Sequence, residues 1–249
     1  MREKVLDTER LAARHRPQGH PVMHQNWGKL LFMHWPVKEN LLRALIPREL
    51  QIDTFGDSAW LAITPFTMWN ISAFPPLIPP IPGLSSMHEL NVRTYVHLEG
   101  VPGVWFFSLD ANSAAAVFAA RTFFYLPYFN AEIELKQNGN RIDYELRREE
   151  DPGAGFRASW TIGNKLPQSQ PGSREFFLTE RYCLYTTKNG GLYRAQIHHE
   201  PWSLQEAELV DFDSDILAAA GITTPSQPPI LHYAEELAVD IWLLQNLDV

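Results

Sequence analysis

The stretch MHELNVRTYV, Met87–Val96, alternates polar and apolar side chains, and this alternation predicts a β-strand. One face of the strand carries Glu89, Asn91, Arg93 and Tyr95, and the other carries Leu90, Val92, Thr94 and Val96. Two arrangements fit this pattern. The polar face lies either in water, as in a half-buried sheet, or in the polar interior of a barrel whose apolar face packs against an outer layer. In the second arrangement the carboxylate and the guanidinium are buried and must be paired.

The rest of the chain predicts many strands and a few short helices. Strands are expected at residues 27–37, 51–68, 87–111, 130–150, 156–162, 183–200 and 230–244, with turns at Gly56–Asp57, Asn138–Gly139 and Lys188–Gly191. Short helices are expected near residues 3–14, 38–50, 112–124, 173–182 and 213–222. We find no internal repeat and no linker. The pattern therefore predicts a flexible N-terminal arm over residues 1–25 and a single α+β, mainly β domain over residues 26–249, with mostly antiparallel strands.

Composition excludes several classes of protein. The chain has 249 residues, of which 45% are hydrophobic and 20% charged, with a net charge of −8. Acidic and basic residues are interspersed, which argues against a nucleic-acid partner. The single cysteine, Cys183, precludes an internal disulfide and fits a reducing cytoplasm. The N-terminus lacks the apolar core of a signal peptide, and no apolar run predicts a membrane-spanning helix. We expect a cytoplasmic protein without a membrane or nucleic-acid partner.

No cofactor or metal motif is present. The sequence has no glycine-rich phosphate loop and no G-x-S-x-G nucleophile elbow. His198 and His199 are adjacent in an expected strand and would point to opposite faces, so they cannot easily share a metal and are expected at an exposed strand end. His34 is expected as a core histidine and Cys183 as a small buried hydrophobe.

A proline-rich stretch, FPPLIPPIPGLSS, occupies residues 74–86. Proline lacks the donor that a central strand needs, so this stretch is not a central strand. Two readings stay open. The stretch is either a surface loop in extended polyproline geometry or a stiff flap over a cavity.

Several motifs occur in an order that resembles the acetoacetate decarboxylase superfamily. LLRALIPREL is similar to its leucine-proline helix, and MHELNVRTYV to its glutamate-bearing strand. GVPGVWFFSLDANSAAAVFAARTFFYLPYFNAEI resembles its next strand, its helix and the turn that carries its reactive lysine. The later segments FLTERYCLY and HHEPWSLQEAEL resemble the YqjF-like proteins, an uncharacterised bacterial family related to that superfamily. The resemblance implies an antiparallel β-barrel or cone with a few short helices, and it favours an inward-facing Glu89.

The resemblance also implies a missing nucleophile. The decarboxylase turn reads approximately Gly-Arg-Glu-x-x-Gly-x-Pro-Lys-Lys. When it is laid on this chain without a gap, Arg121 and Pro127 match the arginine and the proline, and Tyr128 and Phe129 fall on the two lysines. In the decarboxylases the first lysine forms a Schiff base with a ketone. Tyrosine cannot form an imine, so the resemblance implies a pocket without this chemistry.

Two functions remain open for such a pocket, whose expected ligand is a small carbonyl or carboxylate compound. The first is an enzyme with lyase- or hydrolase-like acid–base chemistry. Its expected site residues are Glu89 as base or acid, Tyr128 as hydrogen-bond donor, Arg93 or Arg121 as carboxylate clamp, and Asn91 and Tyr95 as further binding residues. Arg121 has an equal alternative role in binding helix carbonyls. The second function is that of a non-catalytic ligand-binding protein. Because relatives assemble into oligomers, a homo-oligomer is also expected.

Overall fold

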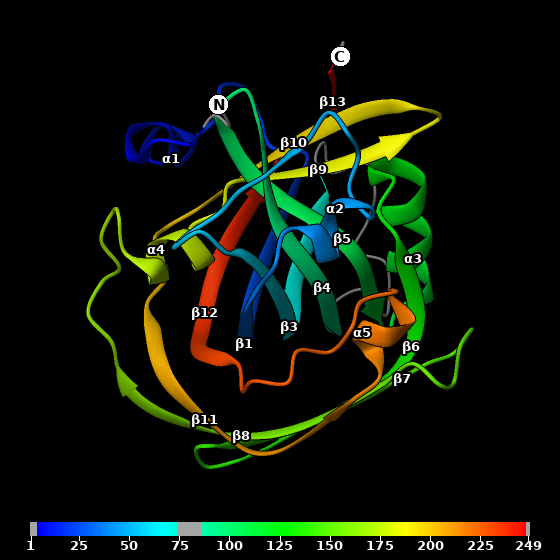
Figure 1. The fold of residues 1–249 in the computed structure, drawn as a ribbon. Helices are drawn as coiled ribbons and strands as arrows, with labels where there is room; N and C mark the ends of the chain where they lie inside the picture. Colours follow the sequence, from blue (N-terminus) through cyan, green and yellow to red (C-terminus); the bar gives the residue numbers. More distant parts are fainter. Residues whose placement is uncertain (1–3, 74–85, 248–249) are drawn as a thin grey trace.

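A computed structural model of the chain describes residues 4–73 and 86–247 (Figure 1). The expected loop or flap at residues 74–86 lies outside these residues, apart from Ser86.

The strands form one sheet, which confirms the mainly β class. They are β1 (Met23–Val37), β2 (Gln51–Ile52), β3 (Ala59–Ala73), β4 (Ser86–Leu98), β5 (Val101–Ala111), β6 (Tyr128–Asn138), β7 (Arg141–Arg148), β8 (Gly155–Lys165), β9 (Cys183–Lys188), β10 (Gly191–His199), β11 (Leu204–Ser214), β12 (Ile230–Ile241) and β13 (Gln245–Leu247). Their order is β13-β10-β9-β5-β6-β7-β8-β11-β12-β1-β3-β4-β2, with additional pairings β10–β12 and β5–β4. Most pairs are antiparallel, as expected, but β5 runs parallel to β6 and to β9.

The helices are short, also as expected. They are α1 (Asp7–Ala13), α2 (Asn40–Arg43), α3 (Ala114–Ala119), the π-helix η1 (Ala120–Phe124), α4 (Arg174–Thr179) and α5 (Ile216–Ala219). Ser113 caps α3 by accepting a hydrogen bond from the Ala116 amide at 3.4 Å. Ser173 caps α4 in the same way, through the Phe176 amide at 3.1 Å. Serine suits this position because its hydroxyl satisfies an amide that the helix leaves free.

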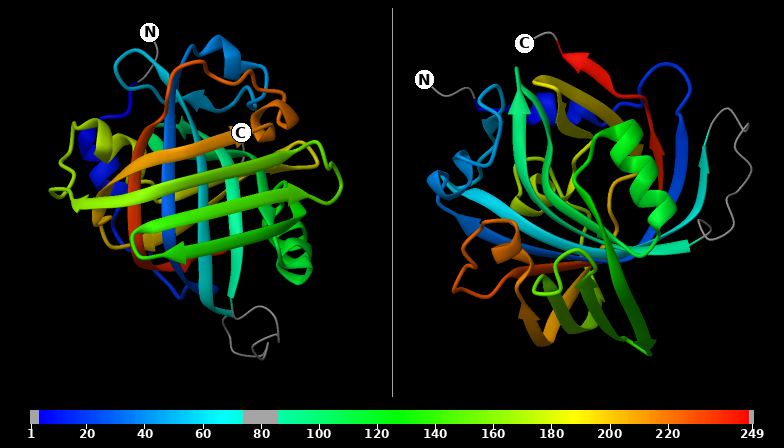
Figure 2. Two further views of the ribbon diagram at one scale, coloured as in Figure 1. Left: turned by 90° about the horizontal axis from the view of Figure 1, so that it is seen from below. Right: turned by 90° about the vertical axis from the view of Figure 1, so that its right-hand side faces the viewer.

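The strands are arranged in crossing layers. Figure 2 shows β6, β7, β8 and β11 lying across β12, β1, β3 and β4. One apolar core lies between these layers and includes Leu31, Val92 and Trp160. A second cluster, with Phe32 and Trp202, packs on the opposite face of β1. Strand β4 is buried on both faces. Its even-numbered apolar residues pack in the first core, and Glu89, Asn91 and Tyr95 on its other face are at most 3% exposed.

Two local expectations need correction. The turn at Gly56–Asp57 is present, with a bridge between Phe55 and Ser58, but β2 pairs with β4 and not with β3. Both edges of β3 are already taken by β1 and β4. Strand β11 was not expected. Its many exposed carboxylates make the alternation of polar and apolar residues hard to recognise in the sequence. The strand forms because it pairs with β8 and β12.

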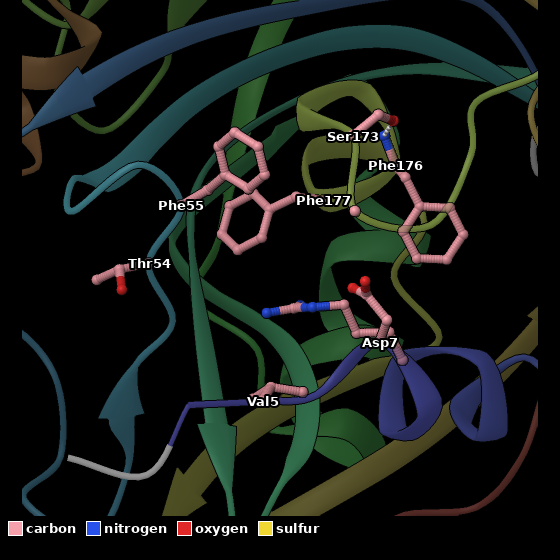
Figure 3. Close-up of a pocket in the computed structure, with 9 residues that line it drawn as sticks. Val5, Asp7, Thr54, Phe55, Ser173, Phe176 and Phe177 are labelled. Atoms are coloured by element: carbon pink, nitrogen blue, oxygen red, sulfur yellow. Dashed lines mark hydrogen bonds between the residues drawn. The ribbon is translucent and has the colours of Figure 1, made fainter. Parts of the chain in front are cut away.

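The N-terminal helix is attached to the body. Arg10 of α1 is only 7% exposed, and both of its terminal nitrogens lie 2.7 Å from the Asp53 carboxylate. A cavity of about 110 Å³ lies at this contact, where the rings of Phe55 and Phe177 are neighbours (Figure 3). Arg10 thus connects α1 to Asp53, and the flexibility expected of residues 1–25 stays a prediction.

Candidate functional site

Glu89 and Tyr128 meet inside the molecule. Glu89 lies on β4, and Tyr128 is the first residue of β6. Strand β5 runs between them, with Ala111 opposite Glu89 and Leu109 opposite Tyr128, so both side chains project from the same face of the sheet. They are 2% and 9% exposed, and the Tyr128 hydroxyl donates to Glu89 Oε2 at 2.6 Å.

Burial gives this pair unusual proton affinities. It raises the pKa of Glu89 to about 7, against the lowering effect of the hydrogen bonds from Tyr128 and Asn91. The nearby Asp110 carboxylate raises the pKa further. Burial, and then the charge of Glu89, raise the pKa of the Tyr128 phenol well above its usual value. Near neutral pH the carboxyl therefore exists in both forms, whereas the phenol stays a donor.

The other predicted residues of β4 continue this polar face. Asn91 is 3% exposed, and its Oδ1 has no hydrogen-bond partner within the described ranges. Arg93 is partly buried beside the Phe32 ring, 5.4 Å from Cζ to centroid, and the buried Nε likewise finds no partner there. Tyr95 is fully buried, and its hydroxyl donates to the Leu178 carbonyl at 2.8 Å. The face is thus not in water, and Asn91 and Arg93 keep hydrogen-bonding capacity.

Three polar side chains that the sequence did not single out as site residues join this face. Thr64 of β3 lies opposite Asn91, and His34 of β1 has its Nε2 2.6 Å from the Tyr95 hydroxyl. His232 of β12 lies opposite Phe32, and the rings of His34 and His232 are 6.4 Å apart. Alternation along WGKLLFMHWPV could have placed His34 on the same side as Phe32, but only the pairing of β1, β3 and β4 brings it to Arg93.

These seven residues define a polar patch. The patch comprises His34, Thr64, Glu89, Asn91, Arg93, Tyr95 and His232. Buried polar atoms at Thr64 Oγ1, His34 Nδ1 and His232 Nδ1 have no partner among the residues that the structure describes. Burial and then the charge of Arg93 hold the pKa of His34 well below its usual value, so its imidazole is neutral. Since buried polar groups are normally satisfied, the patch has the chemistry of a site for a polar ligand or ordered water.

Arg121 is not part of the patch. Its side chain is 45% exposed, and its Nε donates to the Tyr128 carbonyl at 2.7 Å. Another of its nitrogens lies 3.3 Å from Glu150 Oε1. Arg121 therefore stabilises the turn before β6 from the protein surface. Arg93 is the arginine that belongs to the polar patch. The role of Arg121 as a carboxylate clamp stays a prediction.

A groove of about 660 Å³ lies at the turn before β6. Tyr128, Arg121 and Phe129 line it, together with Lys188 at the end of β9. Lys188 was expected only as part of a turn, because it lies far along the chain from the segment that resembles the lysine-bearing one. The parallel pairing of β5 and β9 brings it near.

The remaining histidine and cysteine expectations have a mixed outcome. Cys183 is buried, as expected. His199 is not at an exposed strand end: it is 2% exposed and stacks on Tyr182 with ring centroids 4.4 Å apart.

Within residues 4–73 and 86–247, no three His, Cys, Asp or Glu side chains are grouped as metal ligands. Over the same residues, no helix has the length and apolar character to cross a membrane.

The DUF2071 family model, described as an uncharacterized conserved protein, matches residues 24–238. The chain belongs to this family. It is 44% identical over 230 residues to the uncharacterized protein YqjF of Bacillus subtilis, covering 92% of this chain and 94% of that protein. The likeness to YqjF-like proteins seen in the later sequence segments is thereby confirmed.

Solved structures share the fold of this DUF2071 chain. The enduracididine biosynthesis enzyme MppR, complexed with pyruvate, superposes with a TM-score of 0.66 at 14% identity over 92% of this chain and 91% of MppR. An acetoacetate decarboxylase from Legionella pneumophila gives 0.61 at 13% identity over 99% and 96%. An acetoacetate decarboxylase-like enzyme from Sphingomonas wittichii gives 0.62 at 10% identity over 92% and 94%. At these identities the likeness shows the fold alone.

Proposed function

We propose that the chain binds a small carbonyl or carboxylate compound at the polar patch and acts on it by acid–base chemistry without a Schiff base. The observation that carries this proposal is the buried Glu89–Tyr128 hydrogen bond of 2.6 Å, with the pKa of Glu89 near 7. A general base or acid works best when its pKa lies near the working pH. A pyruvate complex of the structural neighbour MppR supports the ligand class.

Each group of the patch has a role in this proposal. Ionised Glu89 takes a proton from carbon beside the carbonyl, and the electron pair moves onto the carbonyl oxygen. Tyr128, whose phenol stays protonated, turns its single O–H from Glu89 to that oxygen when the ligand binds and donates a hydrogen bond to it. Arg93, whose Nε has no partner in the described part of the chain, pairs with a carboxylate of the ligand. Asn91 and Tyr95 line the same face and fix the ligand's orientation.

The absence of a Schiff base is part of the proposal. It is supported by Tyr128 and Phe129 at the positions that match the two lysines. Lys188 is the lysine of the described chain that lines the groove beside Tyr128. Treatment with borohydride and pyruvate is expected to leave no covalent adduct. A mass increase that maps to Lys188 would contradict this part of the proposal.

The finer architecture belongs to the same proposal. The additional pairings β5–β4 and β10–β12 support a sheet that closes into the expected barrel or cone around the patch. A single domain over residues 26–249, a cytoplasmic location and a homo-oligomer remain expectations.

A non-catalytic binding protein is the second candidate. It is favoured by Tyr128, whose hydroxyl is already bound to Glu89 and whose high pKa makes it a poor proton donor. In that case the patch binds the ligand and no bond changes.

A ligand screen followed by one matched pair of variants tests both candidates. Thermal unfolding with pyruvate, acetoacetate and other small keto acids is expected to reveal a stabilising ligand, because binding to the folded state raises Tm. Glu89→Gln should then abolish turnover while binding persists, and Glu134→Gln, with a side chain 62% exposed on β6, should change neither. Binding without turnover by the unmodified protein would select the binding protein. If no acid or ketone binds, or if Glu89→Gln turns over normally, the enzyme proposal is wrong.

A further inference from the structure

The groove beside Tyr128 lies where β5 changes neighbours. Strand β5 pairs with β9 at Val104–Trp105 and with β6 at Leu109–Ala111. Residues 106–108 of β5 lie between these two pairings. Along this edge of β5, β9 pairs before these residues and β6 pairs after them. We call the resulting opening, with its volume of about 660 Å³, the junction groove. Its size lies within the range of small-molecule sites.

The walls of the junction groove combine aromatic rings with positive charge. Trp105, Phe107, Tyr125 and Phe129 contribute rings, and Lys188 contributes an ammonium group. None of the described residues that line the groove is acidic, although the whole chain carries a net charge of −8. A surface with positive charge and no carboxylate in an acidic protein favours an anionic ligand, and the rings favour a planar one.

Lys188 is the cation of the groove that is open to a ligand. Arg121 already binds the Tyr128 carbonyl and lies 3.3 Å from Glu150. No carboxylate among the described residues forms an ion pair with Lys188, whose Nζ lies 3.7 Å from the centroid of the Tyr125 ring. The side chain of Lys188 is therefore placed over an aromatic face and remains exposed.

Tyr125 is held rigidly beneath this lysine. It follows the π-helix η1 with a φ of 54°, a left-handed conformation that non-glycine residues seldom adopt. The Thr186 hydroxyl donates to the Tyr125 carbonyl at 2.6 Å, and the Tyr193 ring packs edge-on at 5.3 Å. Strained backbone held by several contacts often marks a binding site.

We propose that the junction groove binds aromatic carboxylates, with the carboxylate at Lys188 and the ring against the aromatic walls. This site is separate from the Glu89 chemistry, and it adds an aromatic acid to the small molecules that the chain recognises. Tyr128 lines the groove and also donates a hydrogen bond to Glu89 of the polar patch, so the two candidate sites meet at this residue.

Benzoate is the probe for this site. Acetate is the control ligand that has a carboxylate but no ring, and toluene is the control ligand that has a ring but no charge. In amide and side-chain NMR titrations, benzoate is expected to shift signals of Trp105, Tyr125 and Lys188, and to bind roughly tenfold more tightly than acetate or toluene. Lys188→Gln should weaken benzoate binding roughly tenfold, and Lys188→Arg should retain most of it. Lys165→Gln, an exposed lysine of β8 outside the groove, is the matched control.

The outcomes separate this proposal from the proposed function. Benzoate binding that survives Glu89→Gln supports the groove, whatever becomes of the acid–base proposal. Benzoate shifts that fall elsewhere, equal binding of acetate and benzoate, or an unchanged affinity in folded Lys188→Gln would each overturn the groove proposal. The mapping uses the unmodified protein, and Tyr125→Leu provides a second variant that should lose affinity for the ring.

Discussion

Glu89 shows how much the setting of one residue changes its chemistry. A glutamate carboxyl in water is ionised at neutral pH. Glu89 is only 2% exposed, and its burial raises the pKa of its carboxyl to about 7. The raised pKa means that the folded state holds the proton more tightly than the unfolded chain. The contribution of Glu89 to stability is therefore fully present below about pH 4.5 and lost as the pH rises through about 7.

A Glu89→Gln variant should remove this pH dependence. Between pH 5 and pH 8 we expect the free energy of unfolding of the unmodified protein to fall relative to that of the variant by up to about 3 kcal/mol. Urea unfolding at the two pH values measures the difference. Glu134→Gln should follow the unmodified protein, because that carboxylate is exposed. A constant difference between Glu89→Gln and the unmodified protein at both pH values would contradict the raised pKa.

Removing the Tyr128 hydroxyl should act through the same carboxyl. The hydrogen bond from Tyr128 lowers the pKa of Glu89, so Tyr128→Phe should raise that pKa further. We expect a loss of about 1–3 kcal/mol at pH 8, where Glu89 is ionised, and a smaller loss at pH 5. In a double-mutant cycle with Glu89→Gln, a coupling energy near zero at pH 8 would show that the hydrogen bond contributes nothing.

At the scale of elements, buried ion pairs join segments that are distant in the chain. Asp53 follows β2, Arg10 lies on α1, and Arg181 follows α4. Both guanidiniums contact the one carboxylate, at 2.7 Å and 2.6 Å, and both lie over the Phe177 ring. One carboxylate thus fixes the N-terminal helix and the segment before β9 to the body of the protein.

Loss of this carboxylate should be costly. Asp53→Asn leaves two buried guanidiniums without a counter-charge, and we expect a destabilisation of about 3–5 kcal/mol. The matched control is Asp57→Asn, whose carboxylate is 96% exposed and whose ion pair with Lys4 is 3.8 Å long. The control should change the free energy of unfolding by less than about 0.5 kcal/mol. Equal effects of the two variants in urea unfolding would show that the buried network does not hold α1.

At the scale of the whole molecule, β4 has a fully packed core on one side and the polar patch on the other. The apolar core between the crossing layers is made by β1, β3 and β4 on one side and β7 and β8 on the other. The opposite face carries apolar residues together with the patch, several of whose buried polar atoms lack partners among the described residues. The region around the patch is where we expect ligand binding to add the most stability.

Cys183 reports on opening of the whole molecule. The thiol is 2% exposed, and burial raises its pKa to about 11, so little thiolate forms at pH 8. We expect an aromatic disulfide reagent to modify Cys183 at least about a hundredfold more slowly in buffer than in unfolding concentrations of urea. Rapid modification in buffer would mean that β9 opens locally or that the thiol is accessible.

The sequence determined those features that depend on neighbours along the chain. The period-two pattern of residues 87–96 predicted β4 and grouped Glu89 with Asn91, Arg93 and Tyr95. Serine and alanine-rich segments predicted the capped helix α3, and the segments FLTERYCLY and HHEPWSLQEAEL indicated the YqjF-like family. Such signals are local, because side-chain alternation and helix capping act within a few residues.

Only the tertiary structure decided which distant residues meet. It paired β2 with β4, placed Arg121 outside the patch, and brought His34, His232 and Lys188 to the candidate sites. The parallel neighbours of β5 have no signature in the sequence of either strand. These choices depend on how all strands share the available edges and cores, and this is a property of the packed chain as a whole and not of any short segment.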